Sequence, residues 1–361
     1  MVDRAALTED PLFSIIMPCY NVASYLDAAI DAVQAQTCES WELILVDDGS
    51  APGEAALLDA RAQADPRIRV VAHEVNRGVA AARNTGLAHA RGSYVWMADP
   101  DDRCDARLLV HVAAALETPD VDCVVFGCTE VYVDAAGEVS LRREVLPPVQ
   151  GYFSGQGLRE QVLPLEESTL YGYPWNKVYA RRVLDGLRFE NVPLIEDILF
   201  SIAAFDRADA AVFLQEPLYE YAKRQASNLT NRFEPRYYDV HRRRIEELYC
   251  QQQRWGADTP EVRSRLGSLY VRYIMSALER NCDPRAHMSH ADRVAWCRTV
   301  FDDELFRTLV PGAVSRGGRA LSAGIKLISL RSPFVACALG RVIHLVRHGM
   351  GASYAKLKME R

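Results

Sequence analysis

The sequence contains no long apolar run, no G-x-G-x-x-G after its first apolar segment and no C-x-x-C pair. The first absence excludes a membrane-spanning helix, which needs about 18 or more consecutive apolar residues. The second argues against a dinucleotide-dependent oxidoreductase. The nine cysteines are scattered and odd in number, which argues against a zinc site or a disulfide framework and favours a reducing compartment.

A secretory signal is also missing from the start of the chain. Residues 1–11 carry Asp3, Glu9 and Asp10 and no apolar run. We therefore expect a cytoplasmic protein. Its 361 residues, 49% hydrophobic and 25% charged, are typical of a globular protein with one large domain or two.

Charge is distributed unevenly along the chain. Residues 316–361 carry nine Lys or Arg and one acidic residue, Glu360, whereas the rest of the chain carries 33 basic and 47 acidic residues. An acidic body argues against nucleic-acid binding. The basic tail indicates contact with an anionic surface, such as the inner face of the cell membrane.

Short apolar segments alternate with helical patterns through the first part of the chain. The predicted strands are Phe13–Pro18, Trp41–Val46, Arg69–Ala72, Ser93–Met97 and Val121–Gly127. A helix capped by Ser24 or Asp27 is predicted up to about Gln36, and another over residues 78–90. This order predicts an α/β fold around a largely parallel sheet.

The region after residue 232 is predicted to be helical, which divides the chain into residues 1–232 and a C-terminal region, 233–361. Apolar spacing predicts one helix over residues 238–255 and a second that includes residues 262–278.

A basic amphipathic helix is predicted within the tail, over residues 333–347. Its apolar face would carry Val335, Leu339, Val342, Ile343 and Val346. Its other face would carry Arg341, His344 and either Arg347 or His348. Such a helix suits the headgroup region of an anionic membrane. The alternative is a helix that packs on the protein or at a dimer interface and leaves its cations in solvent.

Polar residues follow three of the predicted strands, at Tyr20-Asn21, Asp47-Asp48 and Asp99–Asp102. In parallel sheets, ligands bind at the carboxyl ends of the strands. We therefore expect these three segments to share one site.

Asp99-Pro100-Asp101-Asp102 places three carboxylates within four residues. Such carboxylates repel one another unless a cation neutralises them, and their oxygens suit Mg²⁺ or Mn²⁺. The alternative is an acidic turn in which Asp102 caps a helix. Asp48 has two interpretations as well, a strand-to-helix turn or an acceptor for a nucleobase or ribose group. Arg83 lies near a predicted helix N-terminus, which suits phosphate.

The order of these motifs resembles that of family 2 glycosyltransferases. The motifs are PCYN at 18–21, DDGS at 47–50, NRGVAAARNTG at 76–86 and DPDD at 99–102. The resemblance continues through WNKVY at 175–179, IEDILF at 195–200 and YAKRQASNLT at 221–230, and it covers residues 12–232. It implies a GT-A fold, with a nucleotide-sugar half at about 12–130 and an acceptor half at about 131–232. Many members build bacterial capsular polysaccharide or exopolysaccharide.

The resemblance implies roles for residues on the donor side. Tyr20 and Asp48 would hold a uracil-type base, and Pro18 would shape its pocket. Arg83 would approach the diphosphate or donor sugar, and Arg224 would reach the diphosphate after a flexible segment closes.

The resemblance also implies the reacting groups. Asp99 would contact ribose or sugar, and Asp101 would ligate the Mn²⁺ or Mg²⁺ that bridges the diphosphate of a UDP-sugar. Asp197 would be the general base, while Glu196 orients the acceptor and is the second choice as base. Pro100 departs from the family pattern and stiffens the turn, although the family varies at this position.

The acceptor side would be lined by Trp175, Asn176 and Lys177. The implied reaction transfers a sugar to a saccharide or polyprenyl-linked saccharide, with inversion of the anomeric centre. One alternative is a non-catalytic sugar-nucleotide-binding or scaffolding subunit, although such a protein need not keep Asp99, Asp101 and Asp197 together. A nucleotidyltransferase would normally show a Gly-rich phosphate loop after the first strand, and this chain has PCYN there.

Overall fold

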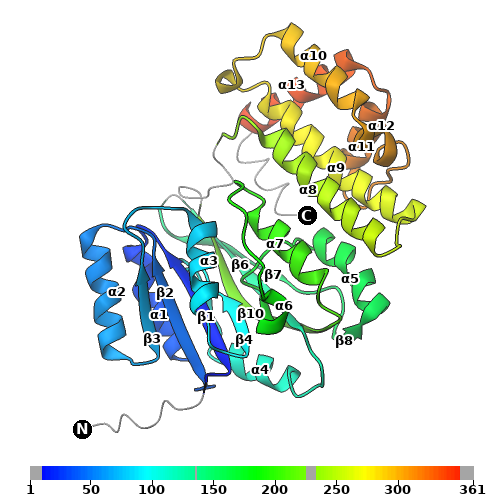
Figure 1. The fold of residues 1–361 in the computed structure, drawn as a ribbon. Coiled ribbons are helices and arrows are strands. Elements are labelled where there is room, and N and C mark those ends of the chain that lie inside the picture. Colours follow the sequence, from blue (N-terminus) through cyan, green and yellow to red (C-terminus); the bar gives the residue numbers. More distant parts are fainter. Residues whose placement is uncertain (1–9, 135, 225–232, 350–361) are drawn as a thin grey trace, which may run out of the picture. The chain divides into compact units, whose positions relative to one another are not determined.

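The computed structural model describes residues 10–134, 136–224 and 233–349 of the chain. These residues form two compact units, Met1–Leu229 and Thr230–Arg361 (Figure 1). The division lies close to the boundary expected at residue 232.

The first unit is built on one ten-stranded sheet (Figure 1). Its strands are β1 (Phe13–Cys19), β2 (Trp41–Asp47), β3 (Ile68–Ala72), β4 (Tyr94–Met97), β5 (Arg103–Cys104), β6 (Cys123–Val133), β7 (Val139–Val145), β8 (Gly151–Ser154), β9 (Lys177–Ala180) and β10 (Ala210–Arg224). The sheet order is β3-β2-β1-β4-β9-β6-β10-β5, with β7 beside β6 and β8 beside β10. The five strands predicted from apolar runs are confirmed, with ends shifted by a few residues.

The sheet is largely parallel, as predicted. Strands β3, β2, β1 and β4 pair in parallel, and so do β6 and β10. Between these two groups, β9 pairs antiparallel with both β4 and β6. Strands β5, β7 and β8 add further antiparallel pairs.

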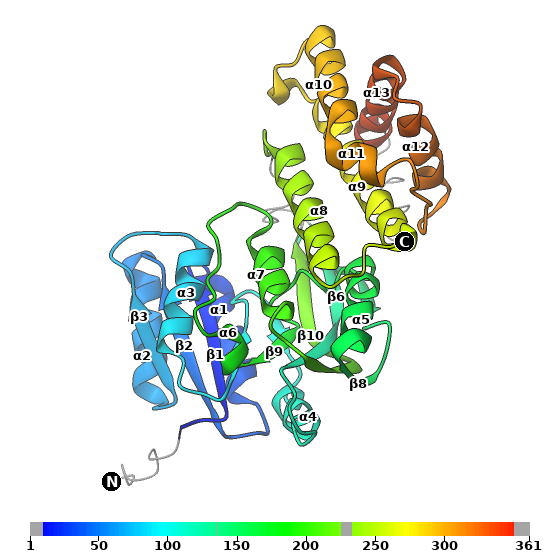
Figure 2. The same ribbon diagram turned by 45° about the vertical axis from the view of Figure 1, so that its right-hand side comes forward.

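Within the described residues, the first unit also contains seven α-helices (Figures 1 and 2). They are α1 (Ala23–Gln34), α2 (Pro52–Ala64), α3 (Val79–His89), α4 (Leu108–Ala115), α5 (Gly155–Glu167), α6 (Arg181–Leu184) and α7 (Glu196–Phe205). The predicted cap of α1 is wrong. The helix begins after Val22, without a side-chain cap, so neither Ser24 nor Asp27 holds that position.

Helix α3 lies very close to β1 because residue 86 is glycine. A Cβ atom there would lie 2.2 Å from Cγ2 of the buried Ile16 on β1. Arg83, which lies about one helical turn before Gly86 on α3, is also buried.

The second unit is helical, as predicted. Its elements are α8 (Tyr237–Arg254), α9 (Pro260–Arg280), the short 3-10 helix η3 (Pro284–Ala286), α10 (His290–Asp302), α11 (Glu304–Leu309), α12 (Arg319–Ser329) and α13 (Pro333–Gly349). Helix α9 contacts α8, α11, α12 and α13 and supplies core residues such as Leu266, Ile274 and Leu278. The last helix approaches α9 closely because Gly340 has no side chain; a Cβ atom there would lie 2.7 Å from Leu278 O.

The tail helix exists, but its buried face differs from the prediction. Helix α13 buries Ala336 and Cys337. Of the predicted apolar face, Val342 and Val346 are exposed, as are Phe334 and Leu345. Small residues allow the closer packing against α9, which leaves the larger apolar side chains outside. Residues 350–361 of the predicted tail lie outside the described residues. Among the described helices, none has the length and apolar character needed to cross a membrane.

Candidate active site at the carboxyl edge of the sheet

The carboxyl ends of β1, β2 and β4 lie side by side at one edge of the sheet. Strand β1 pairs with both of the others, and Cys19 is in register with Asp47. Tyr20 follows β1 and is exposed, whereas Pro18 is buried within the strand. The structure therefore brings the three predicted polar segments together, as the parallel arrangement requires.

Asp48 is buried and joins two loops of this edge. Its Oδ1 accepts a hydrogen bond from Arg77 N at 2.9 Å, and its Oδ2 accepts one from Gly78 N at 2.7 Å. His73 Nδ1 lies 2.6 Å from Oδ1 and its Nε2 lies 2.8 Å from Thr85 Oγ1. Both carboxylate oxygens thus bond to the protein, and the base contact expected of Asp48 stays a prediction.

His73 is a site residue that was not predicted from the sequence. It directly follows β3, so the rule that selected the residues after the other parallel strands would have found it. Gly49 makes the joined loops possible. Its φ of 76° is left-handed, and a Cβ atom there would lie 2.7 Å from Asn76 N.

The three carboxylates of residues 99–102 differ in their surroundings. Asp102 is buried, and its Oδ1 accepts a hydrogen bond from Ala222 N on β10 at 2.8 Å. Burial and the two neighbouring carboxylates raise the pKa of Asp102. The alternative in which Asp102 caps a helix is wrong, because α4 begins after Arg107. Asp102 instead ties this turn to the sheet.

The side chain of Asp101, the predicted metal ligand, is 41% exposed, whereas that of Asp99 is 22% exposed. Arg224 contacts Asp101 twice, with Nη1 2.8 Å from Oδ2 and Nη2 2.6 Å from the backbone O. The guanidinium carbon of Arg224 also lies 4.1 Å from the ring centre of Tyr25. The motif at 221–230 continues beyond Arg224 into residues 225–230, which lie outside the described residues.

Arg83 is the centre of the site. Its side chain is only 4% exposed, and it bridges two carboxylates from distant parts of the sequence. Arg83 Nη1 donates to Asp197 Oδ1, and Nη2 donates to Asp99 Oδ1 at 3.1 Å. One guanidinium thus connects the turn after β4, where the donor is expected, with the first turn of α7, where the base is expected.

Glu196 and Asp197 are the first two residues of α7, and their carboxyl groups have different neighbours. Burial and the neighbouring Asp197 raise the pKa of Glu196 to about 7. Burial also raises the pKa of Asp197, against the opposing effect of the Arg83 cation. The Asp197 side chain is still 30% exposed. Two carboxylates with raised pKa values next to a buried cation are typical of sites that move a proton.

Trp175, Asn176 and Lys177 lie inside the unit instead of on an open surface. Trp175 stacks on Tyr219, with ring centres 4.6 Å apart, and its carbonyl accepts a hydrogen bond from Trp96. All three side chains are buried. Their contact with an acceptor stays a prediction, and in this structure they support the strands behind the site.

Lys177 is buried with three oxygen acceptors around its amine. Nζ donates to Leu170 O at 2.7 Å, to Tyr173 O at 2.6 Å and to Asn176 Oδ1 at 2.8 Å. Burial lowers its pKa to about 7. Three acceptors match the three donors of an ammonium group, so the geometry favours the charged form despite burial.

Tyr219 is a second residue that sequence reasoning missed. Its hydroxyl accepts a hydrogen bond from Asp99 N at 3.1 Å, and its ring stacks on Trp175. Strand β10 thereby holds the acidic turn through both Tyr219 and Ala222.

Comparison with known proteins finds similarity to glycosyltransferases. Residues 14–187 match the sequence profile described as Glycosyl transferase family 2. The chain is 32% identical over 217 residues to a Bacillus subtilis protein named "Uncharacterized glycosyltransferase EpsJ", covering 58% of this chain and 61% of that one. It is 26% identical to the Streptococcus pneumoniae "Glycosyltransferase GlyG", covering 62% and 74%. The chain thus spans about three fifths of the length of the Bacillus relative.

A solved structure shares the fold. It is S. aureus TarS 1–349 in complex with UDP-GlcNAc, with a TM-score of 0.63, 17% identity, and coverage of 93% of this chain and 92% of that one. The similarity confirms the predicted fold class, a GT-A sheet with a helical C-terminal region.

Proposed function

Because residues 14–187 place this chain in glycosyl transferase family 2, we propose that it transfers a sugar from a UDP-sugar to a saccharide or polyprenyl-linked saccharide. The product would belong to a cell-surface polysaccharide. The bridge from Arg83 to Asp99 and Asp197 carries this proposal, because it joins the expected donor and acceptor sides in one site.

In the proposed reaction, Asp197 removes the proton from the acceptor hydroxyl. The hydroxyl oxygen attacks the anomeric carbon in line as the bond to UDP breaks, and UDP leaves with the bonding electrons. An α-linked donor would give a β-linked product. Arg83 would release Asp197 or Asp99 as the donor diphosphate supplies it with another anion.

The donor nucleotide would bind along the same edge. Tyr20 is exposed beside the end of β1 and can stack on a base. Pro18 and Asp48 would form the wall behind it. Arg224 would exchange Asp101 for the diphosphate, since a single guanidinium can serve either anion.

The residues present fit a divalent metal. Asp101 offers partly exposed carboxylate oxygens, with Asp99 next to it, and oxygen donors of this kind suit Mn²⁺ or Mg²⁺. Such a metal, held by Asp101, would stabilise the negative charge that develops on the leaving UDP.

A UDP-release assay over a panel of UDP-sugars with Mn²⁺ tests the proposal. UDP-GlcNAc is the first donor to try, since a neighbour of the same fold binds it. We expect one donor to be turned over, EDTA and Asp101→Ala to abolish turnover, and NMR to show a β-linked product.

The other outcomes of this panel are equally informative. An α-linked product would contradict the inverting mechanism. UDP binding in a thermal-shift assay without turnover, in the presence of a panel of saccharide and lipid-linked acceptors, would favour a non-catalytic subunit. No UDP binding at all would contradict the proposal.

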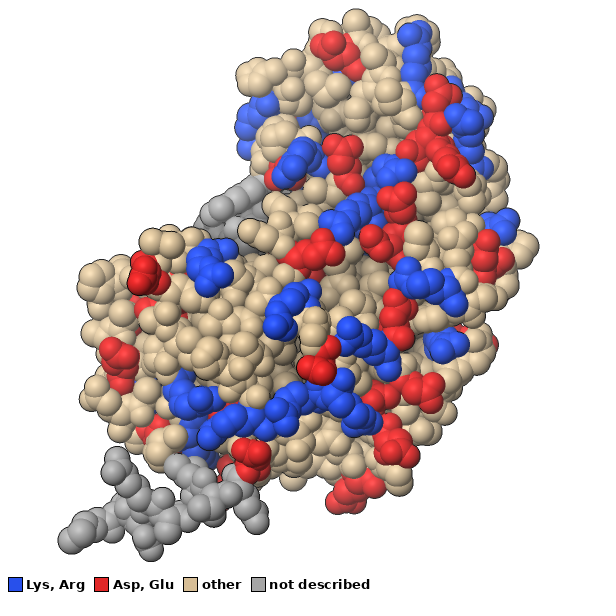
Figure 3. Space-filling view, viewed as in Figure 1, with Lys and Arg blue, Asp and Glu red and all other residues tan. Residues whose placement is uncertain are grey.

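We also propose that the protein works in the cytoplasm, at the inner face of the cell membrane, through helix α13. The exposed apolar residues Phe334, Val342 and Leu345 support this contact. The basic charge supports it less than the sequence suggested, because Arg316 pairs with Glu261 and Arg347 with Glu279. Figure 3 shows the same mixture, with Lys and Arg interspersed among Asp and Glu on the visible face of the second unit.

Replacing both Phe334 and Leu345 by Ser should reduce co-sedimentation with vesicles of anionic lipid several-fold, because insertion of apolar side chains drives such binding. The control replaces Val110 and Val139, exposed apolar residues of the first unit, in the same way. Equal pelleting of the two double variants would show that α13 does not contact the membrane.

A further inference from the structure

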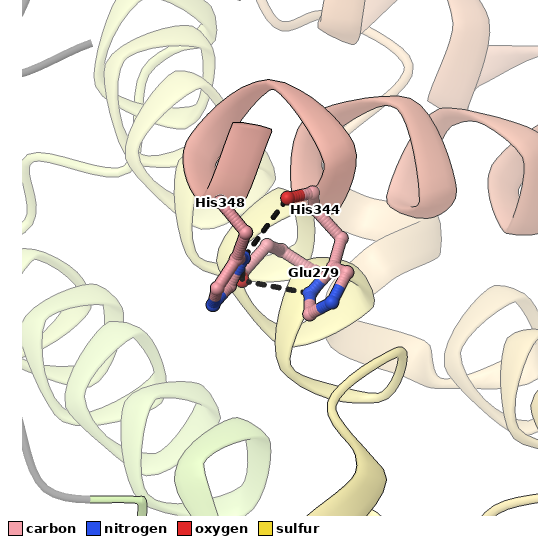
Figure 4. Close-up of side chains that lie close together, drawn as sticks. All are labelled: Glu279, His344 and His348. Atoms are coloured by element: carbon pink, nitrogen blue, oxygen red, sulfur yellow. Dashed lines mark hydrogen bonds and ion pairs between the residues drawn. The ribbon is translucent and has the colours of Figure 1, made fainter. Parts of the chain in front are cut away.

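The second unit contains a cluster of metal-ligating side chains that the proposed reaction does not use. Glu279 lies at the end of α9, and His344 and His348 lie one turn apart on α13 (Figure 4). One ligand atom of each residue lies within 4.8 Å of the others. We propose that these three residues form a binding site for Zn²⁺ or a similar transition-metal ion.

The spacing of the donor atoms supports the proposal. His344 Nδ1 lies 3.2 Å from Glu279 Oε1. With zinc–ligand bonds of about 2.0–2.2 Å, two ligands of a tetrahedral zinc ion lie about 3.3 Å apart. His348 Nδ1 lies 3.9 Å from the same oxygen. A small rotation of the His348 ring, which is 54% exposed, would bring it into coordination.

The surroundings of the ligands are suited to a metal. The Glu279 side chain is only 4% exposed, and its second oxygen accepts a hydrogen bond from Arg347 Nη1 at 2.8 Å, which fixes the carboxylate. His348 Nδ1 lies 2.9 Å from the backbone O of His344. Binding of a metal at Nδ1 would replace this contact and leave the ring proton on Nε2, so the Arg347 contact is the one that orients a ligand. Outer contacts of this kind orient the ligands of metal sites.

The position of the cluster is fixed by helix packing. Gly340 brings α13 against the last turns of α9, and His344 and His348 follow at intervals of four residues, on the same side of the helix. Figure 4 shows both rings directed toward Glu279. A metal here would connect the end of α13 to α9.

The ligand set also selects the class of metal. Two imidazoles and one carboxylate favour Zn²⁺, Ni²⁺ or Cu²⁺, whereas the carboxylates of residues 99–102 favour Mg²⁺ or Mn²⁺. The sequence argued against a zinc site because no cysteines have zinc-finger spacing. The proposed site uses no cysteine, and its partners lie 65 residues apart, from Glu279 to His344.

Calorimetric titration of Zn²⁺ into the full chain, with Mg²⁺ in excess, tests the proposal. We expect one Zn²⁺ per chain, weakened at least tenfold by His348→Gln and by His344→Gln, and retained in Asp101→Ala. His89→Gln is the matched control, because His89 is also exposed and its Nδ1 lies 2.8 Å from the carbonyl four residues earlier. This control should bind zinc as the wild type does.

Two results would overturn the proposal. One is the absence of Zn²⁺ binding by the wild-type chain. The other is Zn²⁺ binding that survives both histidine variants and disappears in Asp101→Ala, which would assign the ion to the acidic turn. Circular dichroism confirms that each variant is folded, and because the readout is metal binding, the result does not depend on glycosyl transfer.

Discussion

Replacing Asp197 by Asn should lower kcat of sugar transfer about 10³-fold while leaving UDP binding nearly unchanged. The amide cannot accept the proton of the acceptor hydroxyl, and general base catalysis contributes about 10²–10⁴-fold. Steady-state rates with the donor that the UDP-release panel identifies measure the loss. A thermal-shift titration with UDP shows whether the donor site is intact.

Glu196→Gln is the matched control, because Glu196 is the adjacent carboxylate and belongs to the same helical turn. If Asp197 is the base, this variant should keep most of its kcat. The pH profile separates the two residues further. A base must be deprotonated, so the rate falls as pH falls through its pKa. The raised pKa of Glu196, about 7, would place that fall near neutral pH if Glu196 were the base. A larger loss in Glu196→Gln than in Asp197→Asn would reverse the assignment.

Replacing Arg83 by Met should lower the free energy of unfolding by about 3 kcal/mol in the presence of EDTA. The guanidinium is buried between Asp99 and Asp197, and its removal leaves both carboxylates without their cation. Removing one partner of a buried ion pair costs about 3–5 kcal/mol of folding stability. The low end of this range applies here because the two carboxylates are partly exposed and keep part of their hydration. Urea unfolding followed by circular dichroism measures the change.

Arg61→Met provides the comparison for this variant. Arg61 also bridges two aspartates, Asp27 and Asp31, but both of these carboxylates are more than half exposed. Ion pairs in solvent contribute about 0–1 kcal/mol, so the loss at Arg61 should stay below about 1 kcal/mol. Similar losses at the two arginines would mean that Arg83 is not a buried charge bridge.

Much of the first unit could be predicted from local sequence. The largely apolar runs at residues 13–18 and 41–46 are strands β1 and β2, and both are buried along their whole length, as is typical of strands in a parallel sheet that is covered on both faces. The residues that follow these strands meet at one edge of the sheet because the strands are parallel. Helix caps were less predictable, and α1 begins without one because Ala23 N donates to Glu54 on a different helix.

The sequence by itself therefore determined the fold class, the resemblance to family 2 glycosyltransferases and the edge of the sheet where the acidic segments gather. Those features depend on periodicity and on short motifs, both of which are local. The tertiary structure alone decided that Arg83 joins Asp99 to Asp197, that Lys177 is buried, and that α13 packs through its small residues. Such pairings depend on side chains that are up to 114 residues apart, as Arg83 and Asp197 are, and only the packing of the whole chain brings them into contact.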